Sequence, residues 1–168
     1  VIGGKQWPPF PLTLWTLLGG ALAAGGSSAL NQYIDRELDK NMQRTAKRPL
    51  ADGRLTDAEG LAFGLGLSLV SYYILASFVN SLTALLSLAG IIYYVILYSV
   101  WLKKATVQNI VIGGGAGAIP PLVGYAAATG TLDWTAWILF LIIFMWTPPH
   151  FWALAIVRMK DYERAGVP

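Results

Sequence analysis

The sequence predicts an all-α protein, a polytopic bundle of membrane-spanning helices. Of its 168 residues, 55% are hydrophobic and only 12% are charged, about half the charged share of an average soluble domain. The charges are also clustered. They leave four uncharged tracts, each longer than the roughly 18 apolar residues that indicate a membrane span: residues 6–34, 60–102, 105–132 and 134–157.

This composition excludes several classes of protein. A mean hydropathy of +0.54 is too high for a soluble globular domain, a disordered chain or a nucleic-acid-binding module. The net charge of +3 reflects basic residues at membrane edges. Because the chain has no cysteine, disulfides, thiolate catalysis and cysteine-bound metals are also excluded.

The uncharged tracts convert into five predicted spans, since a helix needs about 20 residues to cross a bilayer. The longest tract is long enough for two helices and breaks at the polar residues Asn80 and Ser81. Nothing marks a domain boundary, so we predict one membrane domain over residues 1–168. Its spans are residues 11–30, 60–78, 82–102, 109–128 and 134–157.

The basic residues predict the orientation of these spans. Residues 35–59 contain six Lys and Arg, Lys103 and Lys104 follow the third span, and further basic residues follow the fifth. The two other turns contain no Lys or Arg. Alternating spans place all three basic clusters on one side, which should be the cytoplasmic or matrix side.

The strongest candidate for a chemical site is Asn31, Asp35 and Asp39, at the end of the first span. If the helix continues, these residues are each four apart and share one face. Carboxylates at this spacing repel each other, and a bound Mg²⁺, which prefers oxygen ligands, would reverse that penalty. The alternative is a solvated helix end balanced by Arg36 and Lys40.

Basic residues follow this acidic motif closely. Arg44, Lys47, Arg48 and Arg54 lie in the loop after it. Carboxylates that hold a metal beside Arg and Lys side chains that hold oxygens fit a polyphosphate substrate. The competing interpretation is that this loop is basic because it lies on the cytoplasmic or matrix side of the membrane. A polyphosphate site and a topological signal can both be present.

Two further charged clusters are predicted on the same side. Lys103 and Lys104 would reach a diphosphate, although as snorkelling anchors they need no function. Lys160 and Asp161 follow the fifth span and would face the acidic motif across the mouth of the bundle. Two acidic clusters at helix ends suggest a clamp for a metal–diphosphate pair.

His150, the only histidine, lies inside the fifth span after Pro148 and Pro149. An ionisable residue within the membrane is a functional hypothesis by default. The alternative is a packed histidine that bonds a carbonyl freed by the prolines. The glycine-rich residues 113–117 indicate close helix packing in preference to a phosphate loop, because no Lys-Ser or Lys-Thr pair follows them.

Together these residues resemble the intramembrane prenyltransferase family typified by 4-hydroxybenzoate polyprenyltransferase, and within it the heme O synthase subgroup. The resemblance extends over nearly the whole chain. It implies a nine-helix fold of which this chain, starting at Val1 and not at Met, would be a fragment holding helices two to six. The resembling segments are residues 31–50, 98–106, 109–121, 146–152 and 160–168.

The resemblance also implies a function, the transfer of a farnesyl group from farnesyl diphosphate to a vinyl group of heme b (protoheme IX). Mg²⁺ would be held by Asn31, Asp35, Asp39 and Asp161 and would draw charge from the leaving group. Heme would lie near His150. The expected location is a bacterial inner membrane, with the mitochondrial inner membrane as the alternative. Diphosphate would contact Arg48, Lys103, Lys104 and Lys160.

One departure from the family pattern bears on the acceptor. The wider family carries carboxylates four apart in its second motif, whereas here Ala165 stands four residues after Asp161. This favours the heme O synthase subgroup over a prenyltransferase that acts on a quinone precursor or a chlorophyll-type acceptor. A divalent-cation or solute transporter is the alternative from another class, but transporters usually place ion sites near the membrane midplane.

Overall fold

The computed structural model describes residues 7–102, 109–157 and 159, and in this part of the chain every regular element is a helix. The predicted all-α fold class is confirmed. The predictions for Lys103, Lys104, Lys160 and Asp161 fall outside the described residues. The elements are α1 (Phe10–Lys40), α2 (Asp57–Phe78), α3 (Ser81–Ile92), the π-helix η1 (Tyr93–Leu102), α5 (Asn109–Thr129) and α6 (Trp134–Val157).

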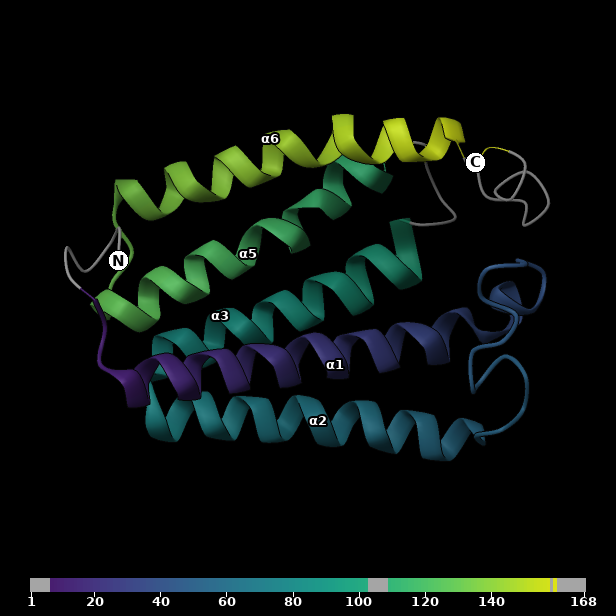
Figure 1. Ribbon diagram of the computed structural model, residues 1–168, viewed down its shortest axis with the longest axis horizontal. Coiled ribbons are helices and arrows are strands. Elements are labelled where there is room, and N and C mark those ends of the chain that lie inside the picture. The colour runs from purple at the N-terminus through teal and green to yellow at the C-terminus, as the bar shows by residue number, and fades with distance from the viewer. Residues whose placement is uncertain (1–6, 103–108, 158, 160–168) are drawn as a thin grey trace.

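Four segments are long and apolar enough to cross a membrane: Asp57–Phe78, Ser81–Trp101, Val111–Thr129 and Trp134–Val157. The predicted span at residues 11–30 lies within α1 but is not among these four. Glycine, serine and threonine residues lower its hydropathy. Nevertheless α1 runs along the long axis of the molecule together with the other helices (Figure 1).

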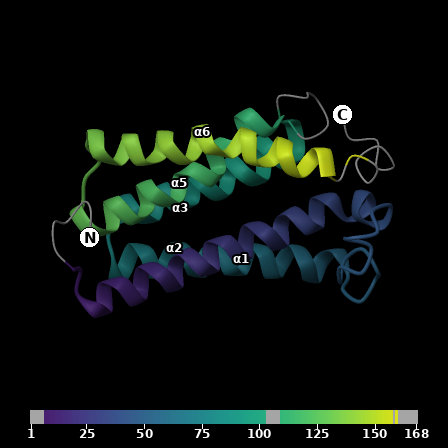
Figure 2. The ribbon, with the colours of Figure 1, turned by 45° about the horizontal axis from the view of Figure 1, so that its top comes forward.

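The helices alternate in direction along this axis. In Figure 1 the loop after α1, the end of η1 and the end of α6 lie at one end of the molecule, and the α2–α3 and α5–α6 turns lie at the other. A second view shows α1 and α2 side by side, with α3, α5 and α6 above them (Figure 2). The described helices therefore have the alternating arrangement on which the predicted orientation of the spans rests.

Small residues let α1 and α2 approach closely, as in many membrane helix pairs. A Cβ atom added to Gly26 would lie 3.0 Å from the backbone oxygen of Gly64 and 2.5 Å from the Ser68 hydroxyl. Further along the pair, the Ser71 hydroxyl donates a 2.7 Å hydrogen bond to the Gly19 carbonyl. This close contact fixes the position of the acidic end of α1 relative to α2.

The break between α2 and α3 lies at the polar residues that the sequence indicated. Asn80 is the N-cap of α3, and its side-chain oxygen accepts a hydrogen bond from the Thr83 amide at 2.8 Å. Its side-chain nitrogen donates to the Ala126 carbonyl at 3.0 Å. One asparagine therefore both starts α3 and ties this turn to α5.

The glycine-rich residues of α5 form a packing surface, as predicted. Cβ atoms at Gly113 and Gly115 would meet the rings of Tyr98 and Tyr93 on η1, and one at Gly114 would meet Thr147 on α6. The helix continues through the pair Pro120 and Pro121. These glycines admit neighbouring side chains, so a phosphate-binding loop is not needed to explain them.

Candidate active site

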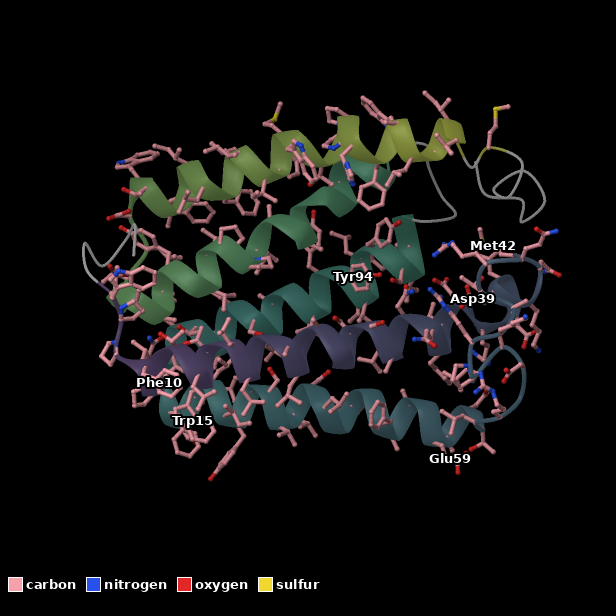
Figure 3. The ribbon with its side chains drawn as sticks, viewed as in Figure 1. Phe10, Trp15, Asp39, Met42, Glu59 and Tyr94 are labelled. Atoms are coloured by element: carbon pink, nitrogen blue, oxygen red, sulfur yellow. The ribbon has the colours of Figure 1, made fainter. Side chains whose placement is uncertain are left out.

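The acidic motif lies where α1 extends ten residues beyond its predicted span. Because α1 continues to Lys40, Asn31, Asp35 and Asp39 do share one helix face, at the end of the molecule where Figure 3 labels Asp39. Asp35 is 2% exposed and Asp39 is 4% exposed. The alternative of a solvated charged helix end is therefore wrong for these two carboxylates, although Glu37 and Lys40 do form an exposed ion pair nearby.

The loop after α1 folds back over this face. Arg48 Nη1 lies 2.7 Å from Asp39 Oδ2, and the Thr45 hydroxyl donates to the Asp39 main-chain carbonyl at 3.2 Å. Leu50 anchors the loop by packing against Gly60 at the start of α2. Successive backbone turns hold the segment between these contacts. The loop thus has a defined structure that supplies a cation to a buried carboxylate.

Arg36 ties the same end of α1 to α2. Its Nε atom lies 2.9 Å from Asp57 Oδ2, and its guanidinium also covers the Tyr33 ring at 4.7 Å. In the alternative of a solvated helix end Arg36 would balance the acidic motif, but it pairs with the first residue of α2 instead. Arg54 pairs with Asp52 within the loop, at 2.7 Å.

The π-helix η1 contributes the other wall of the site. The Ser99 hydroxyl is 2.8 Å from Asn31 Oδ1 and donates to it. Tyr94, labelled in Figure 3, is near enough to Asp35 and Arg48 for both charges to act on its hydroxyl. No role was predicted from the sequence for Ser99, Tyr94 or Thr45, although Ser99 is a polar residue within a largely apolar run.

The donor set fits Mg²⁺, since Asp35 and Asp39 offer two carboxylates one helical turn apart, beside the amide of Asn31. Proteins usually hold Mg²⁺ through one or two carboxylates together with substrate phosphates and waters. No group of three or more His, Cys, Asp or Glu side chains converges on a possible metal position within the described ranges. Asp35 and Asp39 therefore match the usual Mg²⁺ site of proteins, in which two carboxylates bind the ion and its remaining coordination positions are open to a polyphosphate.

His150 lies on α6, in the half of that helix that ends on the side of the acidic motif. Its ring is exposed and stacks on Trp146, with centroids 4.3 Å apart and an interplanar angle of 17°. Phe151 meets the same ring edge-on. The histidine is therefore at the surface of the described bundle, within an aromatic cluster.

A pocket of about 370 Å³ lies far from this site. Leu132, Asp133, Trp134 and Trp137 line it, at the α5–α6 turn. That turn is at the opposite end of the molecule from Asp39 (Figures 1 and 3). The acidic motif and its basic loop, and not this pocket, are the candidate active site.

Comparison with known proteins agrees with the resemblance noted in the sequence. Proteins named protoheme IX farnesyltransferase are 57% identical to this chain in Roseiflexus castenholzii, 56% in Symbiobacterium thermophilum and 54% in Gloeobacter violaceus. These alignments cover 96%, 96% and 99% of this chain, but 30%, 54% and 55% of the relatives. The chain therefore spans about half or less of the length of these curated relatives.

No solved structure matches the chain significantly. The profile of the UbiA prenyltransferase family, in contrast, matches residues 1–168. The match includes the acidic face of α1, the loop that folds over it and η1. This chain belongs to the UbiA prenyltransferase family.

Proposed function

We propose that this chain forms the diphosphate-binding part of a multi-pass membrane enzyme that transfers a farnesyl group from farnesyl diphosphate to a vinyl group of protoheme IX. Water completes the product, heme O, and diphosphate leaves. The single observation that carries the proposal is the pair of buried carboxylates, Asp35 and Asp39, of which Asp39 pairs with Arg48, in a chain 54–57% identical to proteins named for this reaction.

The described residues have distinct parts in this reaction. Asn31, Asp35 and Asp39 hold Mg²⁺, and Arg48 holds diphosphate oxygens in the bidentate manner typical of guanidinium groups. When bound, Mg²⁺ supplies positive charge that stabilises the departing diphosphate. Asp161 is proposed as a further ligand, and Lys103, Lys104 and Lys160 as further diphosphate contacts.

Burial of the two carboxylates supports this assignment energetically. A carboxylate removed from water is costly unless it is paired or hydrogen-bonded. Asp39 meets that requirement through Arg48. A site that keeps anionic oxygens in a partly dehydrated position strengthens every electrostatic interaction with a cation and its phosphate ligand.

The position of the carboxylates disfavours a cation transporter. They lie at the end of α1, next to a basic loop, whereas transporters usually place their ion sites near the midplane on broken helices. The same position fits a substrate with a charged head at the membrane surface and an apolar tail within the bundle.

Mass spectrometry of heme tests the proposal directly. Membranes that contain the full-length protein should add a hydroxyethylfarnesyl group to heme when supplied with farnesyl diphosphate and Mg²⁺, and should not prenylate 4-hydroxybenzoate. Asp35→Ala or Asp39→Ala should abolish transfer while the protein remains inserted. Wild-type turnover in either variant would refute the metal site, and prenylation of 4-hydroxybenzoate alone would change the assigned acceptor.

A further inference from the structure

Building on the proposed function, we infer that Ser99 is a positioning residue for the metal–diphosphate site. Its role is to orient the side-chain amide of Asn31, so that the amide oxygen is available beside Asp35. The hydroxyl of Ser99 joins η1 to the acidic face of α1 through a hydrogen bond to Asn31.

The contact joins segments that are far apart in the sequence. Ser99 Oγ lies 2.8 Å from Asn31 Oδ1, and Ser99 is 2% exposed. Ser99 Oγ also lies 3.0 Å from the main-chain carbonyl of Tyr94. A buried hydroxyl between a helix carbonyl and a side-chain amide holds that amide in a restricted orientation.

The π-helical register brings Ser99 to this place. Tyr94 and Ser99 are five residues apart, which is the hydrogen-bond spacing of a π-helix. In an α-helix, five residues turn the side chain about 140° away from its starting direction. The wider turn of η1 therefore leaves Tyr94 within electrostatic range of Asp35 and Arg48 while the Ser99 hydroxyl reaches Asn31. π-helical segments are often found at functional sites.

Proton counting explains how Ser99 orients the amide. A serine hydroxyl has one proton, but two acceptors lie within reach, Asn31 Oδ1 and the Tyr94 carbonyl. The proton goes to Asn31 Oδ1, the nearer acceptor at 2.8 Å, so the hydroxyl donates to the amide oxygen and fixes its direction. An amide oxygen has two lone pairs, and the second remains available to Mg²⁺, which prefers oxygen ligands.

Ser71 provides a contrast with a purely structural serine. Its hydroxyl is also fully buried and also bonds α1, donating to the Gly19 carbonyl at 2.7 Å. Gly19 is twelve residues from Asn31, a rise of about 18 Å along the helix. The two serines make similar bonds to the same helix, but only Ser99 bonds a side chain of the acidic face.

The test uses the full-length protein and Mn²⁺, titrated by electron paramagnetic resonance in the presence of inorganic pyrophosphate. Ser99→Ala should weaken Mn²⁺ binding about three- to tenfold, the effect of one hydrogen bond, and Ser99→Thr should restore it. Ser71→Ala should lower the melting temperature and leave Mn²⁺ binding unchanged. If Ser99→Ala does not fold, Ser99→Cys keeps its volume with a weaker donor and should show the same loss.

A double-mutant comparison isolates the amide. In an Asn31→Ala background, Ser99→Ala should produce no further loss, because its partner is already absent. An equal loss in both backgrounds, or wild-type Mn²⁺ affinity in Ser99→Ala with only a lower melting temperature, would overturn the inference alone. Failure of the wild-type protein to bind Mn²⁺ with pyrophosphate would instead overturn the proposed function and the inference with it.

Discussion

Arg48 and Asp39 illustrate how single residues prepare the site for an anionic substrate. The Asp39 side chain is 5% exposed and that of Arg48 is 30% exposed, so their ion pair is partly removed from water. Removing one partner of such a pair leaves an uncompensated charge and is strongly destabilising. In the described structure Arg48 therefore provides for Asp39 the positive charge that a metal ion would also provide.

This competition leads to a prediction about metal binding. Arg48→Gln should raise the affinity for Mn²⁺ in the absence of pyrophosphate about fivefold, because a repelling cation near the ligands is lost. The same change should weaken pyrophosphate binding, because a bidentate partner is removed. Arg54→Gln is the matched control, since it removes the same charge from the same loop but pairs with Asp52. Equal effects of the two changes would contradict the prediction.

The exposed ring of His150 supports a second prediction at the residue scale. We propose that the imidazole holds or orients heme, because it is a common ligand of heme iron and stacks within an aromatic cluster. His150→Ala should raise the KM for heme several-fold, change the absorption band of bound heme and leave the KM for farnesyl diphosphate unchanged. A lower melting temperature with unchanged heme affinity and spectrum would make His150 a structural residue.

At the scale of elements, the close packing of α1 against α2 depends on glycine residues. In the Gly26→Ala variant the new methyl group would lie 3.0 Å from backbone atoms of Gly64 and Ser68, which cannot move without shifting α2. Overpacking of this kind costs about 1–3 kcal/mol. Gly26→Ala should therefore lower the melting temperature in detergent and reduce activity, because the acidic end of α1 shifts.

Gly20 is the matched control for that change. It lies on the same helix, and an added Cβ would meet nothing within 4 Å. Gly20→Ala should be neutral or stabilising, by up to about 1 kcal/mol, since alanine reduces the freedom of the unfolded chain. If both variants have the same melting temperature, close helix contact is not what holds the α1–α2 pair together.

Asp133 gives α6 a start that depends on pH. The Tyr125 hydroxyl donates to Asp133 Oδ2, and the amides of Thr135 and Ala136 donate to Oδ1. The Tyr125 hydrogen bond, followed by these backbone amides, lowers the pKa of the Asp133 carboxyl. A carboxyl with a lowered folded pKa stabilises the protein above its ordinary pKa, and this stabilisation is lost as the pH falls through the lowered value.

Melting temperatures measured below about pH 4, where carboxyl groups ordinarily titrate, test whether Asp133 stabilises the protein in this way. The wild-type protein should lose part of its stability on acidification through Asp133. Asn is as good an N-cap as Asp but does not titrate, so Asp133→Asn should remove that part of the pH dependence while keeping α6 intact. Identical acid profiles for wild type and variant would show that Asp133 contributes nothing to it.

Much of the element scale could be predicted from the sequence, because apolar length and charge decide where a membrane helix begins and ends. The span at 134–157 agrees with α6, and Asn80 marks the break between α2 and α3. The π-helix was not foreseen, since Tyr93–Leu102 is as apolar as an ordinary span. Its register depends on contacts with other helices, such as Tyr93 donating to the Ile112 carbonyl.

The candidate active site could likewise be predicted only in part from the sequence. Helical spacing alone places Asn31, Asp35 and Asp39 on one face, whereas their burial and their partners depend on tertiary packing. Ser99 reaches Asn31 only through the π-helical register of a segment 68 residues later. The basic loop predicts that Arg48 contacts diphosphate, which stays a prediction, whereas the ion pair of Arg48 with Asp39 depends on how that loop folds back.

At the scale of the whole molecule, charge is distributed along the axis of the bundle. The described loop after α1 contains Arg44, Lys47, Arg48 and Arg54, and it lies at one end of the molecule (Figure 1). The turns at the other end contain no Lys or Arg. The positive-inside rule assigns the basic end to the cytoplasmic or matrix side, so we propose that the acidic site opens there.

Cysteine labelling of intact bacterial cells tests this orientation, because the chain contributes no cysteine of its own. Lys47 and Thr131 are both exposed and lie in loops at opposite ends of the bundle (Figure 1). With a full-length protein otherwise free of cysteine, a membrane-impermeant maleimide should label Thr131→Cys in intact cells and Lys47→Cys only after permeabilisation. The physical reason is that the basic loop is retained on the side where positive charges accumulate.

Labelling of both variants in permeabilised cells is the control for access. Labelling of Lys47→Cys in intact cells would place the acidic site on the outer side and refute the orientation.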